Sequence, residues 1–240
     1  MNLAGIKELT IGSVKLRELS VSGVKLWQAG RLPAGYTELE YIETDGSSWI
    51  DTGVNASGYN DGIRYTLDVY FVKLLAQSNN NYCFGAFDGS VRAGGLTYYG
   101  TGSFRLLLGT TATISHSYDA VATGHRRYIE VFATSAKDNA TMTVDGNAAT
   151  KNKVASISTG NMPNANVYLG FSSGISATSS SKALVGKIYS FTMSKVDGTP
   201  IREFVPSIRK SDNTVGMFDI VTGRFYDNAG TGTMTAGPAV

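Results

Sequence analysis

Residues 128–134 read YIEVFAT, and residues 140–147 read ATMTVDGN. Apolar and polar side chains alternate along most of both segments, which is the pattern of β-strands with one buried face. The dipeptide Asp145-Gly146 is a turn signal, because Asp hydrogen-bonds its own backbone and Gly accepts a positive φ angle. These residues therefore predict strands and a tight hairpin turn.

Segments of the same kind recur along the chain after residue 31, with turn residues between them. The composition agrees, since the chain holds 28 Gly and only 17% charged residues, whereas helices favour Glu, Lys and Leu. We therefore predict an all-β fold in which two antiparallel sheets stack as a sandwich. The further expected strands are Glu38–Ile42, Trp49–Thr52, Arg64–Val72, Tyr82–Phe87, Phe104–Leu108, Asn166–Phe171, Val185–Met193 and Glu203–Ile208.

Strand alternation also indicates which side chains face the core. Tyr189, Phe191 and Met193 fall on one face of their strand, which we expect to be the buried face. Cys83, the single cysteine, cannot form a disulfide within the chain and is expected to be a small buried side chain. By contrast, residues 172–182 are rich in Ser, Thr, Gly and Ala and predict an exposed loop.

The first thirty residues contain a repeat with a period of ten. Residues 6–15 (IKELTIGSVK) align with residues 16–25 (LRELSVSGVK). Each unit predicts a strand, a two-residue turn and a second strand, because Gly12-Ser13 and Ser22-Gly23 supply the positive-φ residue of a tight hairpin. Two hairpins this short cannot bury their apolar faces alone, so they need a partner surface.

A Gly- and Pro-containing linker follows the repeat, and we place a domain boundary near residue 31. It separates a hairpin-repeat attachment segment, residues 1–30, from a β-sandwich domain, residues 31–240. The residues expected to mediate assembly through the attachment segment are Leu9, Ile11, Val14, Leu19, Val21, Val24 and Trp27.

Residues 124–132 (GHRRYIEVF) followed by 140–147 resemble the central hairpin of laminin-G-like and concanavalin A-like domains, in which a His-containing strand precedes a strand that ends in Val-Asp-Gly. Residues 167–170 and 184–191 look like the last two core strands of that family, with a Gly before the final strand. The resemblance implies a concanavalin A-like jelly-roll β-sandwich.

Residues 32–43 (LPAGYTELEYIE), continuing to 49–53 (WIDTG), resemble the opening strands of a module in tail-associated and other particle proteins of bacteriophages and prophages. Residues 204–206, 215–219 and 223–232 are similar to the closing segment of that module, and the N-terminal repeat is similar to its attachment segments. The resemblance implies a non-enzymatic virion protein, associated with a fibre, tail or head, whose lectin-like sandwich binds a host-surface glycan. The alternative is a purely structural decoration or fibre protein, and a polysaccharide-cleaving enzyme is a more distant one.

In that setting, residues 1–30 would bind other virion proteins, and we expect a homo-oligomer, with a trimer favoured over a dimer. The formal charge is only +2 and no basic run exceeds Arg126-Arg127, so nucleic-acid binding is not expected. The sequence predicts no signal peptide and no membrane insertion. We therefore expect synthesis in the bacterial cytoplasm and a location in the virion.

No catalytic residue is predicted. Glu38, Glu40 and Glu43 invite comparison with the carboxylate triplet of laminarinase-type glucanases, but here the middle residue is Glu rather than Asp and the triplet lies on the first strand of the domain. We interpret these residues as solvated carboxylates. His116 and His125 belong to no Ser/His/Asp arrangement.

No metal or other cofactor is predicted, although related domains often bind Ca²⁺ through side chains on separate loops. Asp51, Asp61, Asp88 and Asp119 are possible donors. Each is interpreted as a turn residue that satisfies backbone donors without an ion.

Glycan recognition needs exposed aromatic rings with hydrogen-bonding neighbours, because a sugar offers an apolar face and a rim of hydroxyl groups. Three segments have that composition and are expected to be loops, namely residues 59–61, 79–82 and 98–99. The alternative is that their tyrosines belong to the core. The candidate ligand-binding residues are Tyr59, Asn60, Asn81, Tyr82, Tyr98 and Tyr99.

Overall fold

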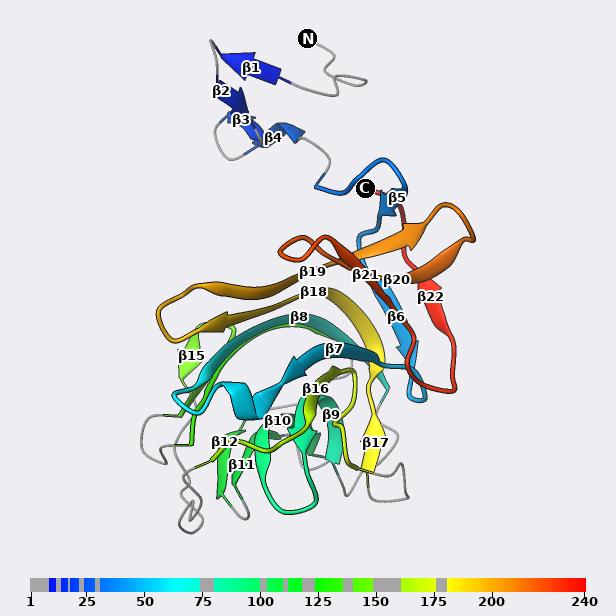
Figure 1. Ribbon diagram of the computed structural model, residues 1–240. Helices are drawn as coiled ribbons and strands as arrows, with labels where there is room; N and C mark the ends of the chain where they lie inside the picture. Colours follow the sequence, from blue (N-terminus) through cyan, green and yellow to red (C-terminus); the bar gives the residue numbers. More distant parts are fainter. Residues whose placement is uncertain are drawn as a thin grey trace.

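A computed structural model of the protein shows two large β-sheets stacked as a sandwich (Figure 1). Among the residues that it describes, the only helical element is a short 3-10 turn, and no helix is long and apolar enough to cross a membrane. The predicted all-β sandwich is confirmed as two stacked, mainly antiparallel sheets, consistent with the expected jelly roll. The described residues are 9–11, 14–16, 18–21, 24–28, 31–73, 80–99, 103–109, 112–117, 124–135, 140–148, 161–175 and 181–240.

The smaller sheet has seven strands. Its order is β12 (Ala112–Ser117), β11 (Ser103–Gly109), β10 (Arg92–Tyr99), β9 (Asn80–Phe87), β16 (Asn166–Leu169) and β7 (Ile50–Asn55), with β17 (Ser181–Ala183) paired in parallel to β9.

The larger sheet has eleven strands. Its main order is β15 (Asn147–Ala148), β14 (Thr141–Val144), β13 (Arg126–Ala133), β8 (Ile63–Lys73), β18 (Val185–Lys195), β19 (Pro200–Arg209), β20 (Thr214–Asp219) and β21 (Arg224–Asp227). Three further strands complete it, namely β5 (Tyr36–Glu38), β6 (Ile42–Asp45) and β22 (Met234–Ala236). One edge of β18 pairs with β8, and the other pairs first with β6 and then with β19.

The core lies between the sheets and is rich in aromatic rings. Tyr65 and Phe84 pack with ring centroids 4.7 Å apart, and Phe84 and Phe191 with centroids 5.3 Å apart. Burial of each such side chain contributes about 1.5–3 kcal/mol. Cys83 is fully buried, as expected, and burial raises the pKa of its thiol.

The predicted turn at Asp145-Gly146 is confirmed between β14 and β15. Both residues have positive φ, 50° and 78°, which is the geometry of a type I′ hairpin turn. The Asp145 side chain also contacts the neighbouring strand β13. Its carboxylate accepts hydrogen bonds from Tyr128 N and Arg127 Nη1, both at 2.9 Å, and so joins the turn to β13.

The expectation that Tyr189 is buried was wrong. The register of β18 against β8 shifts between Ile188 and Ser190, so a β-bulge reverses the alternation at this point. Ile188 is buried with Phe191 and Met193, whereas Tyr189 lies on the outer face of the sheet.

Two other expectations from the sequence need correction. The strand expected at Glu38–Ile42 is a break between β5 and β6, where Leu39 N bonds Pro206 O and the chain passes from one partner strand to another. The segment expected to be an exposed loop, residues 172–182, begins with buried Ser172 and ends in β17. Ser173 N donates a hydrogen bond to Gly85 O, which ties the start of the segment to β9.

The N-terminal repeat forms two separate two-stranded sheets, as predicted. β1 (Leu9–Ile11) pairs with β2 (Val14–Leu16), and β3 (Glu18–Val21) pairs with β4 (Val24–Gln28). The side chains of the expected assembly residues lie outside the described part of the structure, so their role stays a prediction, as does the boundary near residue 31.

Candidate functional site

A pocket of about 540 Å³ lies at one end of the sandwich, between the loop that joins β7 to β8 and the turn that joins β18 to β19 (left in Figure 1). Residues 58–62 supply one side and residues 195–197 supply the other. The two segments are brought together because Ile63 and Lys195 are cross-strand partners in the β8–β18 ladder. The lining residues are Gly58, Tyr59, Asn60, Asp61, Gly62, Lys195, Val196 and Asp197.

The first loop is fixed by local hydrogen bonds. Asn55 caps the 3-10 turn η1 (Ala56–Gly58) by accepting from Ser57 N at 3.0 Å, and Gly62 N donates to Tyr59 O at 3.0 Å. Gly62 has φ +129°, and a Cβ there would lie 2.5 Å from a ring atom of Phe132. Only glycine fits this position, which closes the loop tightly against β13.

Asn60 ties this loop to two other segments. Its Oδ1 accepts a hydrogen bond from Met162 N at 2.9 Å, and its backbone carbonyl accepts one from Ser135 Oγ at 2.9 Å. Within the described ranges its Nδ2 has no partner, so it can donate to a ligand. Beside it, Tyr59 is half-buried and packs against the core.

The second loop is a tight turn at the end of β18. Lys195 N donates to Thr199 O at 2.9 Å, and Thr199 N donates to Asp197 Oδ1 at 2.8 Å. The Thr199 amide holds the pKa of the Asp197 carboxyl below its usual range, so this side chain stays ionised. The Lys195 ammonium and the Asp61 carboxylate form no hydrogen bond in the described part of the chain, and Lys195 acts on the Asp197 carboxylate of the same turn through its charge.

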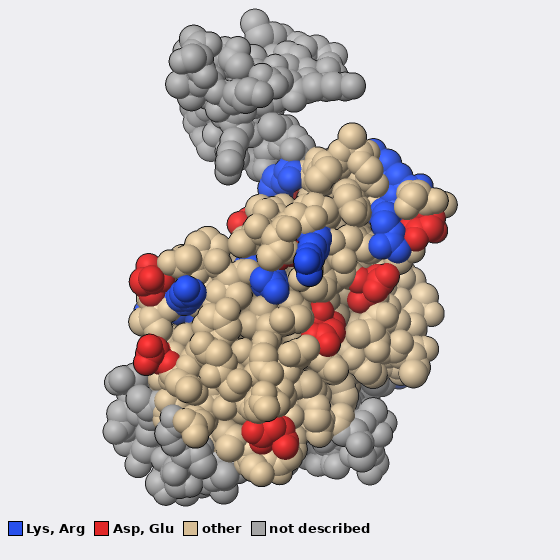
Figure 2. Space-filling model, in the orientation of Figure 1, with Lys and Arg blue, Asp and Glu red and all other residues tan. Residues whose placement is uncertain are grey.

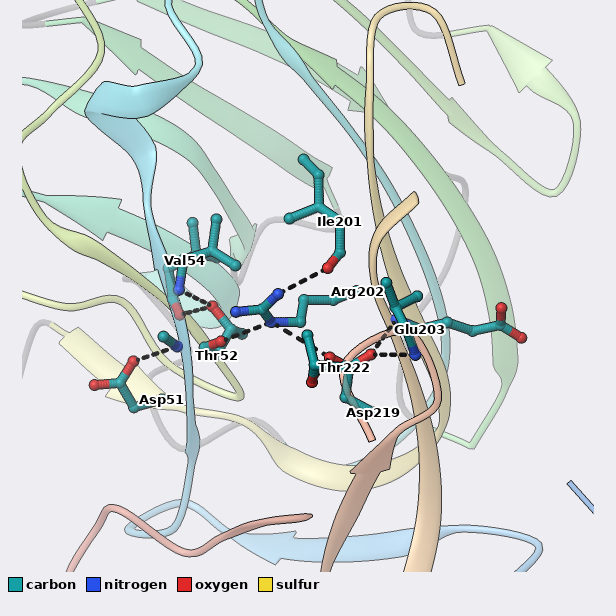
Figure 3. Close-up of polar contacts among 11 residues, drawn as sticks. Asp51, Thr52, Val54, Ile201, Arg202, Glu203, Asp219 and Thr222 are labelled. Atoms are coloured by element: carbon teal, nitrogen blue, oxygen red, sulfur yellow. Dashed lines mark hydrogen bonds and ion pairs between the residues drawn. The ribbon is translucent and has the colours of Figure 1, made fainter. Parts of the chain in front are cut away.

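A polar network connects the strands that lead to these loops (Figure 3). Arg202, just beyond the second loop on β19, donates from Nε to Thr52 O on β7 at 3.2 Å. It also donates from Nη1 to Ile201 O at 2.8 Å. Arg202 therefore links β19 of the larger sheet to β7 of the smaller sheet.

Asp219 holds Arg202 in place. Its side chain is fully buried, and its Oδ2 lies 3.5 Å from Arg202 Nε. The same carboxylate accepts hydrogen bonds from Glu203 N at 2.9 Å and from Thr222 Oγ1 at 2.5 Å (Figure 3). A buried charge needs such partners, so the position of Arg202 is well defined.

The six predicted ligand-binding residues do not meet in one site. Tyr59 and Asn60 lie in a loop, as expected, and both line the pocket. The loop expected at Asn81 and Tyr82 was wrong, because both residues belong to β9 and are 2% exposed. For Tyr82 the structure confirms the expected strand Tyr82–Phe87 and the alternative that this tyrosine is buried.

Tyr82 is buried on the outer side of the smaller sheet, where its ring packs edge-on against Phe171. The loop expected at Tyr98-Tyr99 was also wrong, since both residues belong to β10 and pair with β11. Their side chains lie outside the described part of the structure.

Sequence reasoning missed the second loop of the pocket. The dipeptide Asp197-Gly198 is a turn signal that could have revealed the β18–β19 connection. Its position beside residues 58–62 depends on the long-range pairing of β8 with β18, for which no local signal exists.

The possible metal donors that the structure describes do not gather at one site. Asp51 accepts from Asn166 Nδ2 at 3.1 Å, and Asp88 accepts from Val91 N at 2.8 Å, which lowers the pKa of Asp88. Asp61 lines the pocket, and Asp119 lies outside the described residues. No three His, Cys, Asp or Glu side chains gather as a metal site within the described ranges.

The glutamates considered for catalysis are likewise apart. Glu38 forms an ion pair with Arg31, Glu40 is exposed between β5 and β6, and Glu43 lies on β6. None of them lines the pocket between the two loops.

No protein-family model matches the sequence, and no curated protein sequence matches it. Solved structures do: the mouse laminin alpha1 chain, domains LG4-5, aligns with a TM-score of 0.47 and 17% identity over 70% of this chain and 43% of that one. A Bacteroides ovatus protein described as a candidate carbohydrate-binding protein aligns with a TM-score of 0.47 and 10% identity over 92% of this chain and 66% of that one.

A sialidase from Trypanosoma rangeli aligns with a TM-score of 0.42 and 15% identity over 80% of this chain and 34% of that one. The chain thus spans less than half of the laminin and sialidase chains. The β-sandwich assignment rests on the sheet order of the chain itself.

Proposed function

We propose that the chain is a non-enzymatic glycan-binding sandwich that takes a saccharide of a bacterial surface into the pocket between residues 58–62 and 195–197. The observation that carries this proposal is a set of polar groups that lack hydrogen-bonding partners in the described ranges and line the pocket together with Tyr59. Asn60 Nδ2 and the Lys195 ammonium donate hydrogen bonds, and the Asp61 carboxylate accepts them. Sugar hydroxyl groups need both kinds of partner, and the ring suits the apolar face of a sugar.

The charge of the pocket favours a neutral sugar. Its lining contains two carboxylates, Asp61 and Asp197, and one ammonium, Lys195. A strongly anionic saccharide would be repelled by this excess of negative charge. Figure 2 shows acidic and basic side chains interspersed on the face drawn, so no broad field of one sign dominates there.

Asp197 is poorly suited to be the proton donor of a glycosidase. Glycoside hydrolysis uses two carboxyl groups, one of which has a raised pKa and donates a proton. The hydrogen bond from Thr199 N lowers the pKa of Asp197 instead, which makes it a poor general acid.

The biological setting belongs to the same proposal and is supported by the sequence resemblance. The sandwich would be displayed on a phage particle, with residues 1–30 attached to other virion proteins and the chain assembled as a homo-oligomer. A structural decoration or fibre protein without receptor binding is the rival function.

The test is an array of bacterial surface polysaccharides probed with the full chain and with Gly58→Trp. Gly58 lines the pocket, and a Cβ there meets nothing within 4 Å, so a large side chain can fill the pocket without a backbone clash. Gly35→Trp is the matched control, because Gly35 is equally open and lies outside the pocket.

We expect the wild type and Gly35→Trp to bind the same saccharides and Gly58→Trp to bind them at least about tenfold more weakly, a difference of about 1.4 kcal/mol. A wild-type chain that binds no saccharide would contradict the proposal and favour the structural rival. Release of reducing ends from a bound polysaccharide would contradict its non-enzymatic part.

A further inference from the structure

A second polar site lies on the outer face of the larger sheet. Five side chains follow one another across five strands as direct cross-strand partners. All are half-exposed or exposed, so the row faces outward. In order from β13 to β22 they are Arg126, Tyr70, Lys187, Glu43 and Thr235.

A concavity of about 410 Å³ adjoins this row at the junction of β6, β8, β18 and β22. The next row of partners, Lys73, Val185 and Asp45, forms its other side. Thr44, Thr233, Glu43 and Thr235 complete the lining.

The carboxylate of Asp45 forms a fixed wall of this concavity. Burial acts to raise the pKa of Asp45, but hydrogen bonds from Thr233 N at 2.7 Å and Ser47 N at 2.8 Å outweigh it and lower the pKa. By contrast, the side chains of Glu43, Lys73 and Thr235 have no hydrogen-bonding partner in the described ranges. Three different polar groups can therefore form hydrogen bonds with a ligand, and the Glu43 carboxylate also acts on the Lys187 ammonium across the β6–β18 pair.

Tyrosine rings on the same face of the sheet hold Lys187 in place. Lys187 Nζ lies 3.2 Å from Tyr41 Oη, 4.4 Å from the centroid of the Tyr41 ring and 5.6 Å from that of Tyr70. The β-bulge brings Tyr189 onto the same face, where its ring centroid lies 5.4 Å from that of Tyr41 and 3.6 Å from Arg126 Cζ. Bulges often redirect a side chain beside a functional site.

We propose that this concavity is a second saccharide subsite, which binds a neutral sugar of the same polymer as the loop pocket. The inference rests on the proposed glycan-binding function. Glu43 accepts hydrogen bonds, Lys73 donates them and Thr235 does both, which matches the hydroxyl groups of a sugar. The ammonium of Lys73 disfavours a metal cation, and the two carboxylates disfavour an anion.

The two sites lie at opposite ends of the same strand pair. Ile63 and Lys195 are partners at the loop pocket, whereas Lys73 and Val185 are partners at the outer-face concavity. Because β8 and β18 each have 11 residues, the ends are about 30 Å apart along the strands. A polysaccharide that reaches both sites gains affinity through effective concentration.

The test uses the same polysaccharide array with the full chain and the variant Glu43→Gln/Lys73→Gln. This change removes both charges, keeps the size of the side chain at position 43 and shortens the side chain at position 73 by one atom. Glu203→Gln/Lys210→Gln is the matched control, because these residues line neither pocket. A third variant adds Gly58→Trp to Glu43→Gln/Lys73→Gln, and melting temperatures establish that all variants are folded.

We expect Glu43→Gln/Lys73→Gln to bind long polymers at least about tenfold more weakly than the control. Gly58→Trp should retain weak binding, and the combined variant should retain none. If Glu43→Gln/Lys73→Gln binds as the wild type does while Gly58→Trp loses binding, the second subsite is refuted and the proposed function stands. If Gly58→Trp binds as the wild type does while Glu43→Gln/Lys73→Gln loses binding, the loop pocket is refuted and the outer site stands.

Discussion

The carboxylate of Asp219 lies fully buried at the end of β20, and backbone amides, a hydroxyl group and a guanidinium surround it. Its loss would leave the Arg202 guanidinium without its ion pair and the amides of Glu203 and Val221 without an acceptor. Removal of one partner of a buried ion pair is far more harmful than removal of an exposed charge.

Replacement of Asp219 by Ala should lower the free energy of unfolding by about 3 kcal/mol. For a chain of 240 residues this corresponds to a fall in Tm of about 6–12 °C, measured by calorimetry or circular dichroism. Asp227→Ala is the control, because the Asp227 side chain is 56% exposed and should change stability by less than about 0.5 kcal/mol. Equal effects of the two substitutions would show that the network does not hold β7 against β19.

At the scale of elements, features set by local sequence could be predicted, and features set by distant partners could not. Alternation and Asp145-Gly146 predicted β13, β14 and the turn after β14. The aromatic and amide residues Tyr59-Asn60 indicated one loop of the pocket. The turn at Asp197-Gly198 has a local signal, but the position of residues 195–197 beside the first loop could not be predicted, because it depends on a pairing between residues far apart in the sequence.

The same distinction explains the errors. The bulge at Tyr189 is a shift in the register of β18 against β8. Alternation within β18 alone therefore predicts the wrong face for Tyr189. The segment that contains Tyr82 has the composition of an exposed ligand-binding loop. Tyr82 is nevertheless buried, because residues 171–175 and β17, which are distant in the sequence, pack near it.

The loop between β7 and β8 provides a prediction about backbone conformation. Gly62→Ala should destabilise the protein by about 2 kcal/mol, because the new Cβ would overlap the Phe132 ring at an unfavourable φ. Gly58→Ala, four positions earlier and in open space, should change the free energy of unfolding by less than about 0.5 kcal/mol. Urea unfolding of both variants measures the difference, and a Gly62→Ala variant as stable as Gly58→Ala would contradict the loop geometry.

At the scale of the whole molecule, the sandwich has its own core and its own sheet edges. The hairpins of residues 9–28 form sheets that are separate from the two large ones. The buried residues that form the core of the sandwich run from Leu39 to Met234. We therefore expect the sandwich to fold by itself and the hairpins to attach it to a partner.

Deletion of residues 1–30 should therefore leave a folded sandwich with a cooperative thermal transition, while the truncated chain should fail to enter particles. The truncated and full chains are compared by calorimetry and by incorporation into particles made in the presence of each. An unfolded truncation would mean that the boundary near residue 31 is wrong.

The central claim is that a saccharide binds between the two loops. Its most direct measurement is a map of backbone amide NMR shifts in the full chain, titrated with a short oligosaccharide from the polysaccharide that binds most strongly on the array. We predict that the largest shifts occur at residues 58–62 and 195–197, with a second set around Glu43, Lys73 and Thr235. Unchanged resonances at residues 58–62 and 195–197 under saturating oligosaccharide would contradict the account.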